Sequence, residues 1–61
     1  MPRIIVQAKA GRTHEQKADL ARSVTDAVVS SFGCTPASVT IVIEEIELTN
    51  FAKAGILDSD G

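Results

Sequence analysis

The 61-residue sequence has one cysteine, one histidine, two phenylalanines and neither tryptophan nor tyrosine. A single cysteine excludes an internal disulfide, and one histidine with one cysteine cannot supply the three or four protein ligands of a zinc site. A domain this small buries only about 60% of the surface that its unfolded chain exposes. With disulfides and metals excluded, assembly with other subunits is the predicted source of stability.

The charges and the apolar segments exclude further classes of partner. The formal net charge is -2, and the lysines and arginines are scattered rather than clustered, so nucleic acid is not an expected partner. No apolar run approaches the roughly 20 residues of a membrane span, and no signal-peptide pattern precedes the first apolar segment. We therefore expect a soluble cytoplasmic protein without a membrane partner, built as a single domain over residues 1–61. The acidic end, residues 58–61, is expected to fray.

Two segments, residues 3–8 and 39–46, carry consecutive β-branched residues, which is typical of strands buried on both faces. A helical segment between them makes a βαβ unit, in which the two strands run parallel. One helix can cover only one face of the resulting sheet. A second copy of the chain is therefore expected on the other face.

The helix between the strands has clear end signals. Thr13, followed three residues later by Gln16, is a capping-box pattern, so a helix is predicted to begin near His14. Gly33 suits the left-handed position that closes a helix. The predicted apolar stripe consists of Leu20, Val24, Ala27, Val28 and Ser31. After Leu48 the irregular sequence predicts a short hairpin-like arm that contacts a neighbouring subunit.

Pro2 stands directly before the first predicted strand. Its small size favours removal of Met1, which would leave a free secondary amine at the start of the strand. α-Amino groups have reference pKa values of about 7.7–8.0, and apolar surroundings or nearby cations lower them further. Pro2 is therefore a candidate general base at neutral pH, with the opening of a strand as its alternative, structural role.

The chain resembles the 4-oxalocrotonate tautomerase family of the tautomerase superfamily in four places. These are Pro2, GRTHEQK at residues 11–17, IEE at residues 43–45 and NFAKAG at residues 50–55. The resemblance implies an α/β fold, a single β-α-β unit with two parallel strands, one helix and a C-terminal hairpin arm in the oligomeric tautomerase (MIF-like) architecture. It also implies a homo-oligomer, commonly a hexamer built as a trimer of dimers, and a cofactor-independent isomerase whose N-terminal proline is the base.

Three further site residues follow from the resemblance. Arg12 matches the arginine that grips a substrate carboxylate, a role that suits the planar fork of a guanidinium. Phe51 matches the aromatic wall of the pocket. Thr40 stands where family tautomerases commonly have a second arginine, which polarises the substrate carbonyl. A hydroxyl brings no charge, and loss of such a donor can cost about 10²–10³ in kcat.

Lys9 is the candidate substitute for the missing cation. The related trans-3-chloroacrylic acid dehalogenases carry a cation at this position, paired with the arginine that matches Arg12. They also use a glutamate where this chain has Lys53, and a lysine cannot replace that carboxylate.

The predicted function is tautomerisation of a small 2-oxo or 2-hydroxy-enoic acid, with no cofactor and no metal. One alternative is an enzyme resembling 3-haloacrylic acid dehalogenases or hydratases. The other is a catalytically impaired subunit of a mixed oligomer, which Thr40 favours. Glu44 and Glu45 are not expected to share an acid–base site, since adjacent strand residues point to opposite faces.

Overall fold

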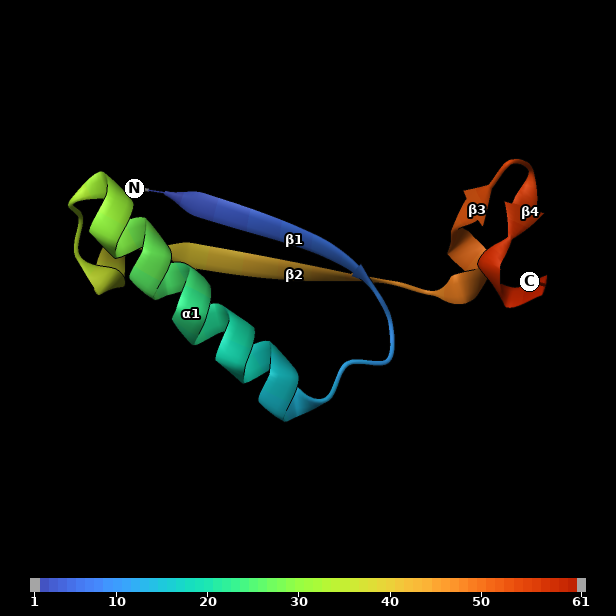
Figure 1. Cartoon of the computed structure of the whole chain (residues 1–61), viewed down its shortest axis with the longest axis horizontal. Coiled ribbons are helices and arrows are strands. Elements are labelled where there is room, and N and C mark those ends of the chain that lie inside the picture. The colour runs from blue at the N-terminus through green and yellow to red at the C-terminus, as the bar shows by residue number, and fades with distance from the viewer. Residues whose placement is uncertain (1, 61) are drawn as a thin grey trace.

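The computed structural model describes residues 2–60 (Figure 1). The strands and the long helix are β1 (Arg3–Lys9), α1 (His14–Phe32), β2 (Thr40–Ile46), β3 (Ala52–Lys53) and β4 (Ile56–Leu57). Three single-turn 3₁₀ helices lie at Pro36–Ser38, Leu48–Asn50 and Asp58–Asp60. This order gives one βαβ unit followed by a small arm, residues 48–60, which projects beyond the end of the sheet (Figure 1).

β1 and β2 pair in parallel, in a register that runs from Arg3 opposite Thr40 to Lys9 opposite Ile46. The helix α1 lies along one face of this two-stranded sheet (Figure 1). The predicted boundaries shift by one residue in each strand, because β1 extends to Lys9 and β2 begins at Thr40. Neither strand has a partner on its outer edge within residues 2–60, so both edges can pair with another chain.

Both ends of α1 are built as the sequence predicts. The Thr13 hydroxyl accepts a hydrogen bond from the Gln16 backbone N–H at 3.1 Å, and the Gln16 side chain accepts one from the Thr13 N–H at 2.9 Å. At the other end Gly33 adopts φ 70° and ψ 31°, a left-handed conformation that costs glycine little. The capping box therefore fixes where the chain turns from the loop after β1 into the helix.

Replacing Thr13 with alanine is expected to lower the free energy of unfolding by about 1 kcal/mol per chain, because the Gln16 N–H then loses its acceptor. Urea denaturation followed by circular dichroism at a fixed protein concentration measures this loss. Thr35→Ala is the control, since Thr35 precedes a 3₁₀ helix without a side-chain cap. Equal stability of the Thr13 variant and the wild type would contradict the assigned role of the cap.

The face that α1 presents to the sheet is rotated from the predicted stripe. Leu20, Val24 and Val28 are half-buried as expected, whereas Ala27 and Ser31 are exposed. The half-buried positions of the helix are Lys17, Leu20, Ala21, Val24, Thr25, Val28 and Val29. The prediction was wrong for Ala27 and Ser31, because a helical-wheel projection does not specify how the helix axis crosses the twisted sheet.

The arm contains the predicted hairpin. Ala52 pairs with Leu57 and Lys53 with Ile56, leaving a two-residue loop. In that loop Ala54 has φ 54° and Gly55 has φ 80°, the positive pair of angles that a type I′ turn requires. The Asp58 N–H donates to the Phe51 carbonyl at 2.9 Å and so closes the arm at its base.

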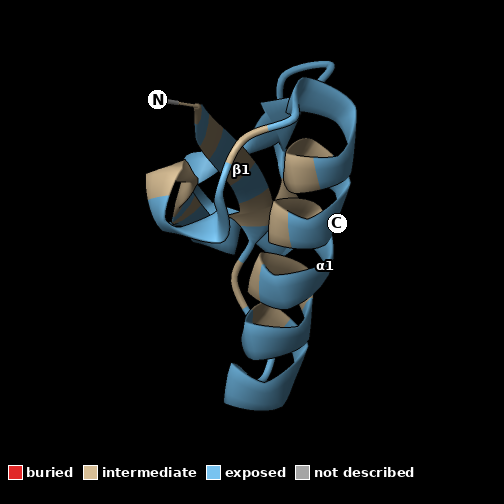
Figure 2. Cartoon of the chain, turned by 90° about the vertical axis from the view of Figure 1, so that its left-hand side faces the viewer, coloured by how far each residue is buried: buried red, intermediate tan, exposed pale blue. Residues whose placement is uncertain are grey.

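The chain has no fully buried side chain among residues 2–60 (Figure 2). On the sheet face away from α1, Ile5 is 56% exposed and Val42 41% exposed. The Cα radius of gyration is 14.7 Å, against about 10–11 Å for a compact domain of this length. A single copy therefore leaves much of its apolar surface exposed to solvent, and the assembly expected from the sequence would cover it.

Candidate active site

Pro2 directly precedes β1, at the end of the sheet where both strands begin, and it is half-buried. Its carbonyl accepts a hydrogen bond from the Thr40 backbone N–H at 3.0 Å, which ties the start of β1 to the start of β2. In Figure 1 this end of the sheet lies beside the C-terminal end of α1, far from the arm. Met1, whose removal the predicted chemistry requires, lies outside the described residues.

Thr40 is close to Pro2 through the backbone, but its side chain belongs to the other face of the sheet. The register pairs it with Arg3, and alternating strand residues point to opposite faces. The Thr40 hydroxyl oxygen is inaccessible to solvent and has no hydrogen-bond partner within residues 2–60. The structure of one chain therefore does not bring this hydroxyl to the face on which Pro2 lies.

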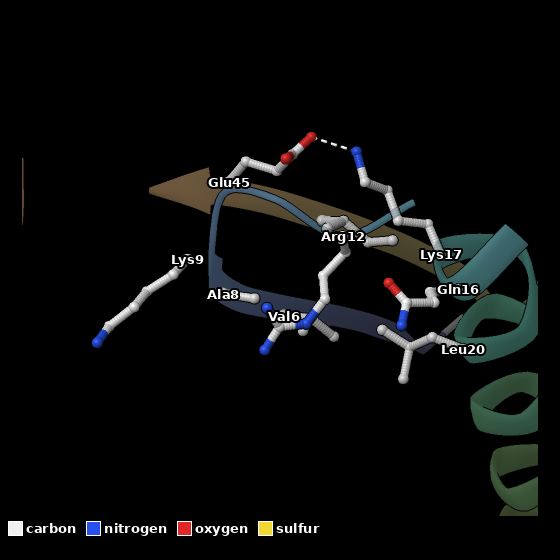
Figure 3. A pocket seen from close by; sticks show the side chains of 9 residues that line it. Val6, Ala8, Lys9, Arg12, Gln16, Lys17, Leu20 and Glu45 are labelled. Atoms are coloured by element: carbon white, nitrogen blue, oxygen red, sulfur yellow. Dashed lines mark hydrogen bonds and ion pairs between the residues drawn. The ribbon is translucent and has the colours of Figure 1, made fainter. Parts of the chain in front are cut away.

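The opposite end of β1 carries a cavity of about 230 Å³ between the sheet and the first turns of α1 (Figure 3). Its apolar wall consists of Val6, Ala8, Leu20 and Ile43, and its polar lining of Lys9, Arg12, Gln16, Lys17 and Glu45. In Figure 3 the Arg12 side chain extends toward Val6, whereas the Lys9 ammonium points away from the cavity. The cavity is smaller than the roughly 300–1,000 Å³ of typical ligand sites, which suits a small substrate or one part of a larger site.

Two of the cations at this cavity have acidic partners. Lys17 Nζ pairs with Glu45 Oε1 across the helix–sheet gap, the contact drawn in Figure 3. Lys9 Nζ pairs with Asp58 of the arm and also lies 5.2 Å from the centroid of the Phe51 ring. Arg12 takes part in no ion pair within residues 2–60.

Asp58 corrects one expectation from the sequence. The acidic end was expected to fray, yet Asp58 begins an ordered turn and its side chain is only 24% exposed. Gly61, the last residue of that segment, lies outside the described residues. The ion pair with Lys9 joins residues 49 positions apart, so no local sequence signal could reveal it.

Glu44 and Glu45 behave as predicted for adjacent strand residues. Glu44 accepts a hydrogen bond from the Gln7 side-chain amide at 2.9 Å on the open face, whereas Glu45 pairs with Lys17 on the helix face. The two carboxylates thus do not form a common acid–base site.

The predicted site residues fall into two groups within one chain. Pro2 precedes β1, whereas Lys9 ends it and Arg12 follows it, and the seven residue steps from Pro2 to Lys9 span roughly 23 Å at about 3.3 Å per residue. Phe51 lies with Lys9 at the far end. Within one chain, Pro2 and the backbone of Arg12 thus lie toward opposite ends of β1.

The family profile described as "Tautomerase enzyme" matches residues 2–57 of this chain. The chain belongs to the tautomerase family. It is 38% identical over 60 residues to a 2-hydroxymuconate tautomerase of Bacillus subtilis (strain 168), a match that covers 98% of this chain and 97% of the relative. The tautomerase family assignment confirms the predicted isomerase.

Solved structures of tautomerase homologues share the fold. YwhB, a homologue of 4-oxalocrotonate tautomerase, superposes with a TM-score of 0.92 at 37% identity, with 98% of both chains covered. A heterohexamer 4-oxalocrotonate tautomerase from Chloroflexus aurantiacus J-10-fl gives a TM-score of 0.89 at 32% identity, with 98% of this chain and 97% of that chain covered. The predicted tautomerase fold, a βαβ unit with a C-terminal hairpin, is thus confirmed. Within residues 2–60 no helix combines the length and the apolarity needed to cross a bilayer.

Proposed function

We propose that this protein catalyses the cofactor-independent keto–enol tautomerisation of a small 2-hydroxy-enoic or 2-oxo acid, with the free amine of Pro2 as the general base. The amine takes the proton of the enol hydroxyl and returns a proton to a carbon of the same conjugated system. Substrate and product are isomers, and the amine is regenerated. One observation carries the proposal. A chain of the tautomerase family has a proline, Pro2, at the start of β1 and a small cavity lined by Arg12 near the other end of that strand.

A second copy can close that separation. The outer edge of β1 has no partner within residues 2–60, and antiparallel pairing of two β1 strands would set the start of one beside the end of the other. Such a two-fold pairing would bring Pro2 of one copy to the Arg12 cavity of the second, twice in each dimer. The Phe51 ring and the Lys9 stem would add apolar surface there, which favours the neutral amine.

The remaining exposed apolar surface supports a larger assembly of these dimers. Ile5 and Val42 lie on the sheet face that the pairing of β1 edges leaves open. Covering this face with further dimers gives the hexamer, a trimer of dimers, that we propose. In that assembly Thr40, on the same open face, lies at the interface between dimers, and rotation of its enclosed, unpaired hydroxyl toward a neighbouring site would let it donate to the substrate carbonyl.

The proposed reaction is tested by following the absorbance of 2-hydroxymuconate and enol-phenylpyruvate during ketonisation by the assembled protein. We expect rates well above those of the Pro2→Ala protein at equal concentration. Equal rates for the two proteins, after mass spectrometry has shown that Met1 is absent from the wild type, would refute the proposal.

Arg12→Gln is expected to raise KM by about 10- to 100-fold, with a smaller change in kcat. The reason is that a charged hydrogen bond to the substrate carboxylate contributes about 1.5–3 kcal/mol. Steady-state ketonisation kinetics measure the change. Arg22→Gln is the matched control, because Arg22 is an exposed helix arginine paired with Asp19. An unchanged KM in the Arg12 variant would show that another group holds the carboxylate.

A further inference from the structure

The arm holds the last cation of β1. The Lys9 ammonium pairs with Asp58 and lies over the Phe51 ring at 5.2 Å, so one side chain of β1 has two partners in the arm. The Asp58 side chain is 24% exposed, against 49% for Lys9, so the carboxylate is the more enclosed member of the pair. With both partners in the arm, the Lys9 ammonium points away from the cavity that Arg12 lines (Figure 3).

The charges around the cavity are therefore largely balanced. Lys9 is paired with Asp58, and Lys17 with Glu45. Arg12 is the cation at this cavity that has no acidic partner within residues 2–60. Thr40, which the proposed function brings to the site from another copy, contributes no positive charge.

We propose that Asp58 determines substrate charge in this enzyme: by neutralising Lys9, it adapts the site to an acid with one carboxylate and disfavours dicarboxylates. This inference rests on the proposed function for the identity of the reaction, but the selectivity itself concerns binding. The substrate class is then a 2-oxo acid, or its enol, whose remaining part is uncharged and packs on the apolar wall of the cavity.

The physical reason is the different response of single and double anions to one charge. Removing the Asp58 charge makes the potential at the site more positive, and a dianion interacts with that potential roughly twice as strongly as a monoanion. The site is partly solvated, so the effect should weaken as salt shortens the screening length. Loosening of the arm would instead weaken the binding of both kinds of anion alike.

The test uses two unreactive acids with six carbons, adipate with two carboxylates and hexanoate with one. At low ionic strength we expect Asp58→Asn to tighten adipate about tenfold and hexanoate only about threefold, as measured by isothermal titration calorimetry on the intact oligomer. Asp60→Asn is the matched control, because Asp60 lies in the same turn and in no ion pair within residues 2–60. Asp58→Glu, which keeps the charge, should restore the selectivity of the wild type.

The double variant Lys9→Gln/Asp58→Asn completes the design. If Asp58 acts by neutralising Lys9, removing both charges should return the ratio of adipate to hexanoate affinity to that of the wild type. An unchanged ratio in Asp58→Asn, or a gain that persists without Lys9, overturns the inference. Because neither acid reacts, these outcomes are independent of Pro2, and absence of ketonisation by the wild type would refute the proposed function alone.

Discussion

Pro2→Ala is expected to lower kcat for ketonisation by about 10²–10⁴, the usual contribution of a positioned general base. The alanine variant retains an α-amine, but it lacks the secondary amine and the ring that fixes the direction of its lone pair. KM should change little, since Arg12 in the proposed site still holds the carboxylate. Steady-state kinetics with enol-phenylpyruvate, followed by ultraviolet absorbance, measure both parameters.

Pro36→Ala is the control for the loss of a proline. Pro36 begins a 3₁₀ helix before β2 and lies in neither group of predicted site residues, so its variant should keep activity within about twofold. Mass spectrometry must show that Met1 is absent from every protein compared, since a retained methionine converts the Pro2 amine into an amide. A Pro2→Ala enzyme with the activity of the wild type would show that the secondary amine of proline is not required for ketonisation.

Ile5→Asp is expected to abolish assembly, and with it both the folded state and activity. Ile5 is 56% exposed in one chain, on the sheet face that the proposed oligomer covers. The change forfeits about 1.5–3 kcal/mol of apolar burial in each copy and adds the larger cost of burying a carboxylate without a partner. Sedimentation velocity should show monomers, and far-ultraviolet circular dichroism should show loss of helix.

Ser23→Lys is the matched control for inserting a charge. Ser23 is exposed on α1, and a lysine there lies four residues after Asp19 and three before Asp26, which favours the helix. This variant should assemble like the wild type. A folded, active Ile5→Asp monomer would contradict both the proposed interface and a site shared between copies.

The sequence predicts those parts of the fold that depend on neighbouring residues. Thr13 and Gln16 give the start of α1, and Gly33 gives its end, because capping is set within one turn. The parallel pairing of β1 with β2 follows from the apolar runs and the connecting helix. The exact face of α1 does not follow, because packing against a twisted sheet selects Ala21 over Ala27.

The candidate site is less accessible to prediction from sequence. Pro2 and Arg12 stand out by their chemistry and by their place in the family pattern, but nothing in a linear sequence says that they occupy opposite ends of one strand. Asp58 was missed because its partner Lys9 is brought to it only by the path of the arm. Pairs between distant segments depend on tertiary structure, which local composition does not encode.

The lack of a fully enclosed side chain among residues 2–60 has a consequence for the life of the protein in a cell. When a chain becomes stable only by associating, its folded fraction follows mass action and rises with its own abundance. If the chain assembles as proposed, a newly made copy is exposed to proteases until it meets its partners, so the survival of the product depends on the rate of translation. A modest fall in expression would then reduce the pool of finished enzyme more than proportionally.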